Sequence, residues 1–286
     1  MNAFKTALLL AGLTALLVLV GNLIGGTQGA IIAFAVSLGL NFVSYWWSDK
    51  IVLAMHGARE VGPDDEPRLH AIVERLCERA GLPKPRIYVM EDPSPNAFAT
   101  GRGPQHAAVC ATTGILELLD DRELEGVLGH ELGHVKNRDI LIGTIAASLA
   151  GAISMLASIL RWNLMWGGSR RDSRDNGNPL AALGAILAVI LAPLVAMLVQ
   201  LAVTRSREYG ADETGAHLCH DPEALASALA KISKRTELVP LATATEGTAH
   251  MFIENPFGRV SALFSTHPPT EERIRRLLAM RDTARV

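Results

Sequence analysis

The sequence predicts a mainly α-helical, polytopic membrane protein with a substantial water-soluble part. Apolar residues make up 49% of its 286 residues, and the mean hydropathy is +0.23. Charged residues make up only 20%, below the quarter or so of ordinary soluble domains. They are absent from four long apolar stretches and gather in the segments between them. The net charge of −2 gives no reason to expect nucleic acid binding.

The four apolar stretches are the candidate membrane spans, at about residues 6–24, 30–46, 140–160 and 180–203. A helix needs about 20 residues to cross a hydrocarbon core of about 30 Å. The second stretch is at the short end of that range, and the third and fourth either span or only enter the bilayer. All four tryptophans lie just beyond a span end, as expected for an aromatic belt at the membrane surface: Trp46, Trp47, Trp162 and Trp166.

The spans divide the chain into four segments. Residues 1–46 form a hairpin of two helices; the first apolar stretch is longer than the apolar region of a cleaved signal peptide. Residues 47–139 and 204–286 are polar and together form one water-soluble domain, interrupted by the apolar pair within 140–203. The cysteines form no CxxC pair and no disulfide framework, which indicates a reducing compartment for this domain: Cys77, Cys110 and Cys219.

A metal-binding pattern, His130-Glu131-Leu132-Gly133-His134, lies in the first polar segment. The acidic residues of 120–123 precede it and mark a helix start. On a helix, positions i and i+4 share a face, so His130 and His134 can bind one metal ion. Glu131 can then take a proton from the metal-bound water, which is the chemistry of HExxH zinc hydrolases. An incidental pair of histidines on a solvated helix face is the alternative.

A catalytic zinc site needs a third protein ligand. The metzincin pattern would place it at position 140, which is Ile140 here. Glu208 is the best candidate, with Asp212 one turn later positioned to orient a histidine ligand. His134 lies shortly before the third apolar stretch and Glu208 shortly after the fourth. Because two apolar segments return the chain to the side that it left, both groups can reach one ion.

Several motifs together resemble the HtpX-type membrane zinc metalloproteases, which are relatives of the CAAX prenyl proteases. The similarity covers nearly the whole chain, and the matching segments are residues 96–101, 112–114, 130–134, 205–212 and 265–274. It implies a helical, gluzincin-like metallopeptidase domain with a small β-sheet and one Zn²⁺ per chain. The implied ligands are His130, His134 and Glu208, with Glu131 as the catalytic base. The implied activity is endopeptidase cleavage of unfolded or damaged membrane proteins in stress-linked quality control.

The resemblance also implies roles for residues outside HExxH. Asn96 would lie beside the metal and contribute to the substrate cleft. His267 would lie near the zinc, either stabilising the oxyanion or occupying the open metal position at rest. Arg205 would hold Glu208 or the oxyanion, although a plain surface arginine is nearly as good an interpretation. Residues 107–113 are small and β-prone, and are either the edge strand that pairs with a substrate or an ordinary sheet strand.

The implied location is a bacterial inner membrane, with several spans and the active site facing the cytoplasm. Seven basic residues near span ends on the peptidase side outnumber four on the other side, which weakly favours this orientation. Two alternative functions stay open. One is a CAAX-type processing protease for lipidated peptides, and the other is a non-catalytic membrane scaffold with a structural metal site or none.

Overall fold

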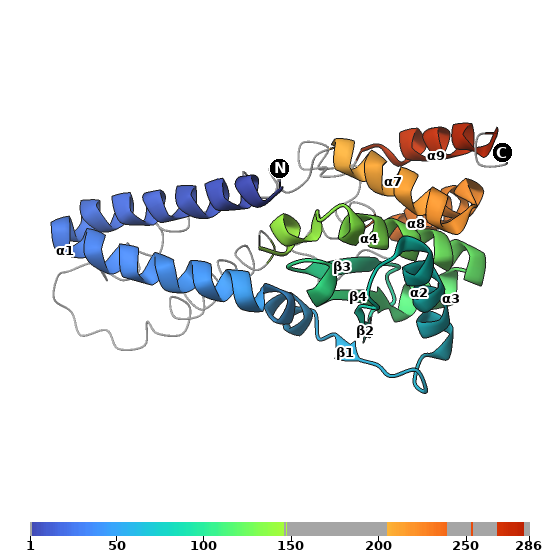
Figure 1. Ribbon diagram of the computed structural model, residues 1–286, viewed down its shortest axis with the longest axis horizontal. Coiled ribbons are helices and arrows are strands. Elements are labelled where there is room, and N and C mark those ends of the chain that lie inside the picture. Colours follow the sequence, from blue (N-terminus) through green and yellow to red (C-terminus); the bar gives the residue numbers. More distant parts are fainter. Residues whose placement is uncertain (1, 146, 148–204, 239–252, 254–267, 283–286) are drawn as a thin grey trace, which may run out of the picture.

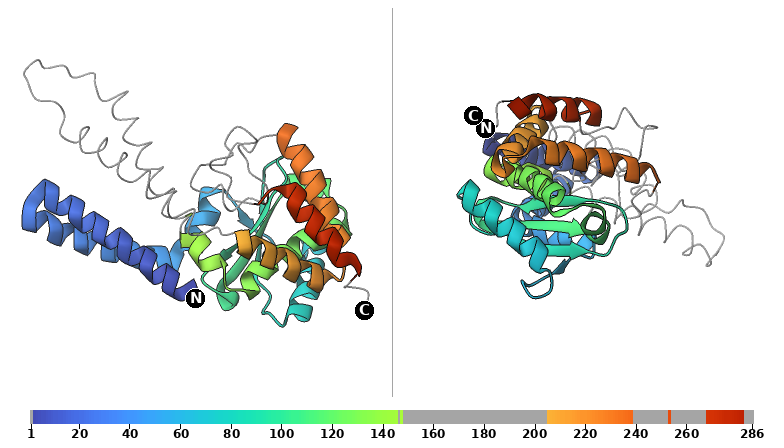
Figure 2. Two further views of the ribbon diagram at one scale, coloured as in Figure 1. Left: turned by 90° about the horizontal axis from the view of Figure 1, so that it is seen from above. Right: turned by 90° about the vertical axis from the view of Figure 1, so that its right-hand side faces the viewer.

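The computed structural model describes residues 2–145, 147, 205–238, 253 and 268–282. They form a helical hairpin that projects from a domain in which helices surround one small sheet (Figure 1). The left-hand view of Figure 2 shows the same separation, with the hairpin extending away from the domain. The prediction of a mainly helical protein with a small β-sheet is confirmed.

The hairpin is α1, Asn2–Met55, two helical arms joined at a kink. The kink lies at Gly25 and Gly26, and Gly26 adopts φ 57° and ψ −147°, a conformation that other residues rarely tolerate. The amide of Asn41 donates a hydrogen bond of 2.9 Å to the hydroxyl of Thr14 on the other arm. The two arms are therefore joined by a polar contact within an otherwise apolar surface.

The second arm, Gly25–Met55, is the one helix in the described part of the chain that is long and apolar enough to cross a membrane. Large apolar side chains along it are exposed, for example Ile31 at 63%, Ile32 at 65% and Phe42 at 57%. Exposed apolar surface of this extent requires a lipid or protein partner. Most of the predicted stretch at 140–160 and all of that at 180–203 lie outside the described residues, so a multi-pass topology stays a prediction.

The sheet has four strands in the order β1-β2-β4-β3. The strands are β1 Arg59–Glu60, β2 Arg86–Met90, β3 Ala97–Gly101 and β4 Ala107–Thr112. β2 and β4 are parallel, with Arg86 opposite Ala108, whereas β3 and β4 are antiparallel, with Ala97 opposite Ala111. Of the two interpretations of residues 107–113, the structure shows the ordinary sheet strand, because β4 is paired on both sides and the edges are β1 and β3. All six residues of β4 are buried, which its small side chains permit.

Helix α4, Asp121–Lys136, is the central element of the domain and begins where the acidic residues predict. Asp120 accepts from the Glu123 backbone amide, and the Glu123 side chain accepts from the Asp120 amide, a reciprocal capping box. Leu124, Leu128 and Leu132 on this helix are fully buried. α4 packs against β3 and against several helices from both polar segments, so the two segments share one core.

The remaining elements cover α4 and the sheet (Figure 1). Helices α7 and α8, which come after the apolar pair, lie against α4, and α9 packs on α8 and α7. The bounds are α2 Pro67–Ala80, α3 Thr113–Leu118, α7 Arg205–Cys219, α8 Pro222–Leu238 and α9 Thr270–Ala279, with short 3-10 helices η1 Pro104–His106 and η5 Met280–Asp282.

Candidate metal centre

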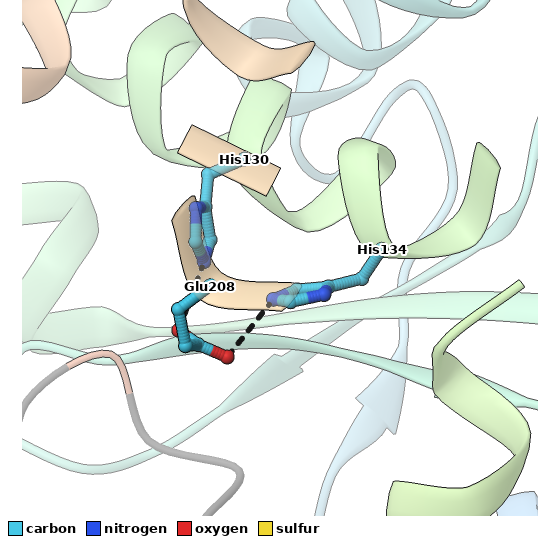
Figure 3. Close-up of side chains that lie close together, drawn as sticks. All are labelled: His130, His134 and Glu208. Carbon is cyan, nitrogen blue, oxygen red and sulfur yellow. Dashed lines mark ion pairs between the residues drawn. The ribbon is translucent and has the colours of Figure 1, made fainter. Parts of the chain in front are cut away.

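Two histidines of α4 project from the same face of the helix, one turn apart (Figure 3). The ring centroids of His130 and His134 are 4.7 Å apart, with the ring planes at 86°. His130 is only 2% exposed, and His134 is half-buried. Two imidazoles held in this way inside the domain are suited to a shared cation rather than to hydration by bulk water.

Helix α7 brings Glu208 to the same point. One Glu208 carboxylate oxygen lies 3.5 Å from His134 Nε2, and the other lies 3.8 Å from His130 Nε2 (Figure 3). The three ligand atoms all lie within 4.8 Å of one another. Tetrahedral zinc with bonds of about 2.0–2.1 Å holds its ligand atoms about 3.3 Å apart. Two imidazole nitrogens and one carboxylate oxygen form the three-ligand donor set of a catalytic zinc site, in which water or substrate takes the fourth position.

The site depends on a close approach of α4 and α7, which glycines allow. A Cβ atom placed on Gly215 would lie 2.6 Å from the His130 backbone nitrogen and 2.9 Å from the Gly129 carbonyl carbon. A Cβ atom on Gly133 would lie 3.0 Å from the Ala211 carbonyl oxygen. A larger residue at Gly215 would push α7 away from α4. Glycine at this crossing therefore lets Glu208 reach the histidines.

The orientation of His130 is fixed by Asp212, one turn after Glu208 on α7. Asp212 Oδ1 lies 2.8 Å from His130 Nδ1, which turns Nε2 toward Glu208. Both groups are buried, Asp212 at 4% exposure. A carboxylate on the far nitrogen of a ligand histidine sets its tautomer and increases its basicity as a ligand.

Arg273 of α9 supports this carboxylate, and sequence reasoning did not single it out. It is 1% exposed and donates to both Asp212 oxygens, at 2.9 Å from Nε and 2.7 Å from Nη2. It also donates to the backbone carbonyl of Ile253 at 3.1 Å. Burial opposes ionisation of Asp212, but Arg273 and His130 outweigh it and lower the pKa of the Asp212 carboxyl to about 2.

Glu131 lies beside the cluster without belonging to it. The backbone N–H of Ala99, in β3, donates to Glu131 Oε2 at 2.9 Å. Glu131 is 6% exposed, and burial raises the pKa of its carboxyl above the ordinary value, while His130 and His134 oppose that rise only in part. A carboxylate with a raised pKa is a better proton acceptor near neutral pH.

The negative charge around His134 also suits a cation. Burial would lower the pKa of His134, but the Asp139 carboxylate beside its Nδ1 and the carboxylates of Glu208 and Glu131 raise it to about 9. The Asp139 carboxylate lies 3.6 Å from His134 Nδ1. Because a metal ligand must be a neutral imidazole, metal binding releases the proton that this cluster of carboxylates otherwise favours.

The other predicted site residues come from three different parts of the chain. Asn96 is 1% exposed, and its side-chain oxygen accepts a 3.0 Å hydrogen bond from the Ile253 amide, so it connects the start of β3 to the segment before α9. Arg205 is exposed at the start of α7. His267 lies outside the described residues. Arg273 lies within the closing motif, residues 265–274. Membership of that motif is the one sequence feature that could have pointed to a role for Arg273 at the site.

Comparison with known proteins identifies the family to which this chain belongs. The family model described as Peptidase family M48 matches residues 63–281. A protein from Pyrococcus furiosus named "Protease HtpX homolog" is 56% identical over 275 residues, covering 96% of this chain and 94% of its own. One of the same name from Paraburkholderia phytofirmans is 50% identical over 288 residues, covering 99% of both chains.

A solved structure, "Crystal Structure of S. mikatae Ste24p", has a similar fold. Its TM-score is 0.51 at 19% identity, and the match covers 96% of this chain. The chain spans 64% of the length of that protein. At this identity the likeness concerns the fold alone.

Proposed function

Because the chain belongs to peptidase family M48, we propose that it is a zinc-dependent membrane endopeptidase that hydrolyses peptide bonds of unfolded or damaged membrane proteins. One observation carries the activity: His130, His134 and Glu208 converge within 4.8 Å, and the Glu131 carboxylate lies beside them. The names of the relatives, "Protease HtpX homolog", support a protease. The resemblance described for the sequence supports the role in membrane-protein quality control.

The residues of the chain divide the chemistry between them. His130, His134 and Glu208 would hold one Zn²⁺, and Asp212 and Arg273 keep His130 in its orientation. Zinc, when bound, would supply a Lewis acid that polarises the scissile carbonyl and acidifies a water molecule. Glu131 accepts the proton of the attacking water and passes it to the leaving amine. Its hydrogen bond from Ala99 holds the carboxylate in place for both transfers.

The edge strand β3 is the part of the sheet best placed to hold an extended substrate. β3 pairs on one side with β4, while its other side carries the Ala99 amide that contacts Glu131. Extended peptides commonly add to a sheet edge through main-chain hydrogen bonds. A substrate aligned along β3 would bring a peptide bond to the metal centre without a deep chamber. This arrangement favours unfolded segments over compact domains.

The proposed membrane location rests on α1. Its second arm has the length and hydropathy of a span and exposes large apolar side chains. Lys136 and Arg205 are both exposed near the metal centre, and the excess of basic residues on this side supports a cytoplasmic orientation. The relatives include bacterial proteins, in keeping with a bacterial inner membrane.

The catalytic role is tested with Glu131→Gln. This variant keeps the size of the side chain but cannot accept the proton, so it should retain zinc and lose at least about 10²-fold in cleavage of labelled casein. Glu117→Gln is the matched control, because Glu117 is exposed on α3 and away from the site. Near-normal turnover by Glu131→Gln would refute the mechanism and favour the non-catalytic scaffold.

The substrate class is tested by proteomics of membrane fractions from cells with the wild-type protein or Glu131→Gln. Accumulation of damaged membrane proteins in the variant is expected. Exclusive accumulation of unprocessed lipidated peptides would instead support a CAAX-type processing protease.

Topology is tested by single-cysteine labelling in intact cells, on a background lacking the native cysteines. Cysteines at positions 136 and 205 should both resist an impermeant maleimide, because both lie on the cytoplasmic side. A cysteine at Ser169 should react if the third and fourth apolar stretches span the membrane. Opposite labelling at 136 and 205 would exclude the metal site, since its ligands could not then meet across a bilayer of about 30 Å.

A further inference from the structure

A second site lies where the end of α1 meets the sheet, and none of its residues belongs to the metal centre. It is a groove of about 670 Å³ between the last turns of α1, the start of β2 and the turn joining β3 to β4. We call it the basic groove, and define it by six of its lining residues: Trp46, Lys50, Lys84, Arg86, Arg102 and His106. A groove of this volume is large enough for a small organic ligand.

The lining of the groove carries more positive than negative charge. Asp49 is its one carboxylate, and it pairs with Arg86 at 2.6 Å. Lys84 pairs with Glu74 at 2.8 Å. Within the described ranges, no carboxylate pairs with Lys50 or Arg102. Two positive charges are therefore uncompensated in one groove, which suits an anion.

Arg102 is held in place by stacking rather than by an ion pair. Its guanidinium carbon lies 4.3 Å from the centroid of the Trp46 ring, within the range of a cation–π contact. This contact leaves the N–H donors of the guanidinium available, and a guanidinium can bind phosphate oxygens through two parallel hydrogen bonds. The charge and geometry of the groove therefore favour a phosphate over a neutral or cationic ligand.

The position of the groove along α1 identifies where such a phosphate would come from. The helix before it exposes apolar side chains, among them Phe42, and then Trp46 and Trp47 at 47% and 43% exposure. Tryptophans gather at the level of the lipid headgroups. Lys50 follows Trp46 by four residues, about 6 Å along a helix. The free cations thus lie just beyond the aromatic residues, at the depth of lipid phosphates.

From this charge, geometry and depth we propose that the basic groove binds the headgroup of an anionic phospholipid, with the phosphate at Lys50 and Arg102. The acyl chains lie along the apolar face of α1. A choline headgroup would bring a further positive charge into the groove, so phosphatidylglycerol is preferred over phosphatidylcholine. The proposal rests on the membrane insertion of α1 and not on peptidase activity.

The bound headgroup would connect the membrane helix to the strand that contacts Glu131. Arg102 directly follows Gly101, the last residue of β3, and the Gly101 amide donates to the Thr144 hydroxyl at 3.1 Å. Two residues earlier, Ala99 donates to Glu131. A lipid held by both Lys50 and Arg102 therefore fixes the height of β3 above the bilayer.

The test uses the full chain in vesicles, carrying Glu131→Gln to remove turnover, with the tryptophans at 162 and 166 replaced by phenylalanine. Trp46 and Trp47 are then the only tryptophans and report lipid at the groove. Quenching by brominated phosphatidylglycerol is compared with quenching by brominated phosphatidylcholine. The parent should prefer phosphatidylglycerol, and Lys50→Gln and Arg102→Gln should each lower the ratio of binding constants about fivefold, the effect of one basic residue near a membrane surface.

Two controls separate the groove from general charge. Arg59→Gln removes an equal charge from an exposed position close to the end of α1 but outside the groove, and should keep the preference. Arg102→Lys keeps the charge and should retain most of it. Equal quenching by both lipids in the parent, or the same loss in Arg59→Gln, would overturn the proposal. Displacement of the brominated lipid by millimolar inorganic phosphate would also overturn it, since that outcome indicates a site for free anions.

Discussion

Gly215→Ala is the sharpest test of how the metal centre is assembled. The added Cβ would lie 2.6 Å from the His130 nitrogen, whereas ordinary contacts begin at 3.4 Å. The opposing atoms belong to the backbone of α4, so no side-chain rotation relieves the overlap. The two helices must therefore move apart by about 0.8 Å at this crossing. Metal sites tolerate deviations of only about 0.2 Å in ligand distance.

Two losses are expected from this displacement. Overpacking of a close helix crossing costs about 1–3 kcal/mol of folding free energy. Zinc affinity should fall by about tenfold or more, the order seen when the supports of metal ligands are disturbed. Thermal unfolding in detergent, with and without a chelator, measures the first loss. Competition with a chromophoric zinc chelator measures the second.

Gly210→Ala is the matched control on the same helix. A Cβ at Gly210 meets nothing within 4 Å, and alanine is favoured over glycine inside a helix by about 1 kcal/mol. This variant should therefore be slightly more stable and bind zinc as the parent does. The reasoning fails if Gly215→Ala matches the parent in both measurements, or if Gly210→Ala is destabilised as strongly.

Three further predictions concern the supports of the site and the buried thiols. Arg273→Met removes the guanidinium that pairs with both oxygens of the buried Asp212 carboxylate, leaves His130 as its remaining partner, and should cost about 3–5 kcal/mol in stability. Arg276→Gln, on the exposed face of α9, should change the unfolding midpoint little, and equal midpoints for the two variants would contradict the role given to Arg273. Glu208→Gln should weaken zinc binding itself in the same chelator competition, and unchanged affinity would place the third ligand elsewhere. Burial raises the pKa of the Cys77 thiol to about 11 and those of the Cys110 and Cys219 thiols to about 12. N-ethylmaleimide at pH 7.5 should therefore label the folded protein roughly a hundredfold more slowly than the denatured protein, as followed by mass spectrometry. Rapid labelling of the folded protein would be the contrary result.

The metal-binding helix was readable from the sequence because all of its signals are local. Asp120 and Glu123 are three residues apart and cap the helix, and the spacing of His130 and His134 places both rings on one face. No local pattern identifies Glu208 as the third metal ligand, because it lies 74 residues after His134. Its choice depended on an argument about membrane crossings, and the approach of α7 to α4 is what brings the carboxylate to the imidazoles.

The choice between an edge strand and an inner strand for residues 107–113 shows a limit of the same kind. A run of small, β-prone residues identifies a strand, but it does not say which neighbours pair with it. Only the sheet order places β4 between β2 and β3 and leaves β3 at the edge, beside Glu131. Pairing of strands joins residues distant in the chain, and no local pattern encodes it.

The sequence by itself determined the helical character of the protein, its apolar stretches, the HExxH helix and the chemistry that such a helix performs. These follow from periodicity, capping and residue type within a few turns of the chain. The tertiary structure alone decided which carboxylate meets the two histidines, that Arg273 holds Asp212, and that Arg102 stacks on Trp46. The physical reason is that each of these contacts depends on the distance between separate helices and strands, which the packing of the whole core sets.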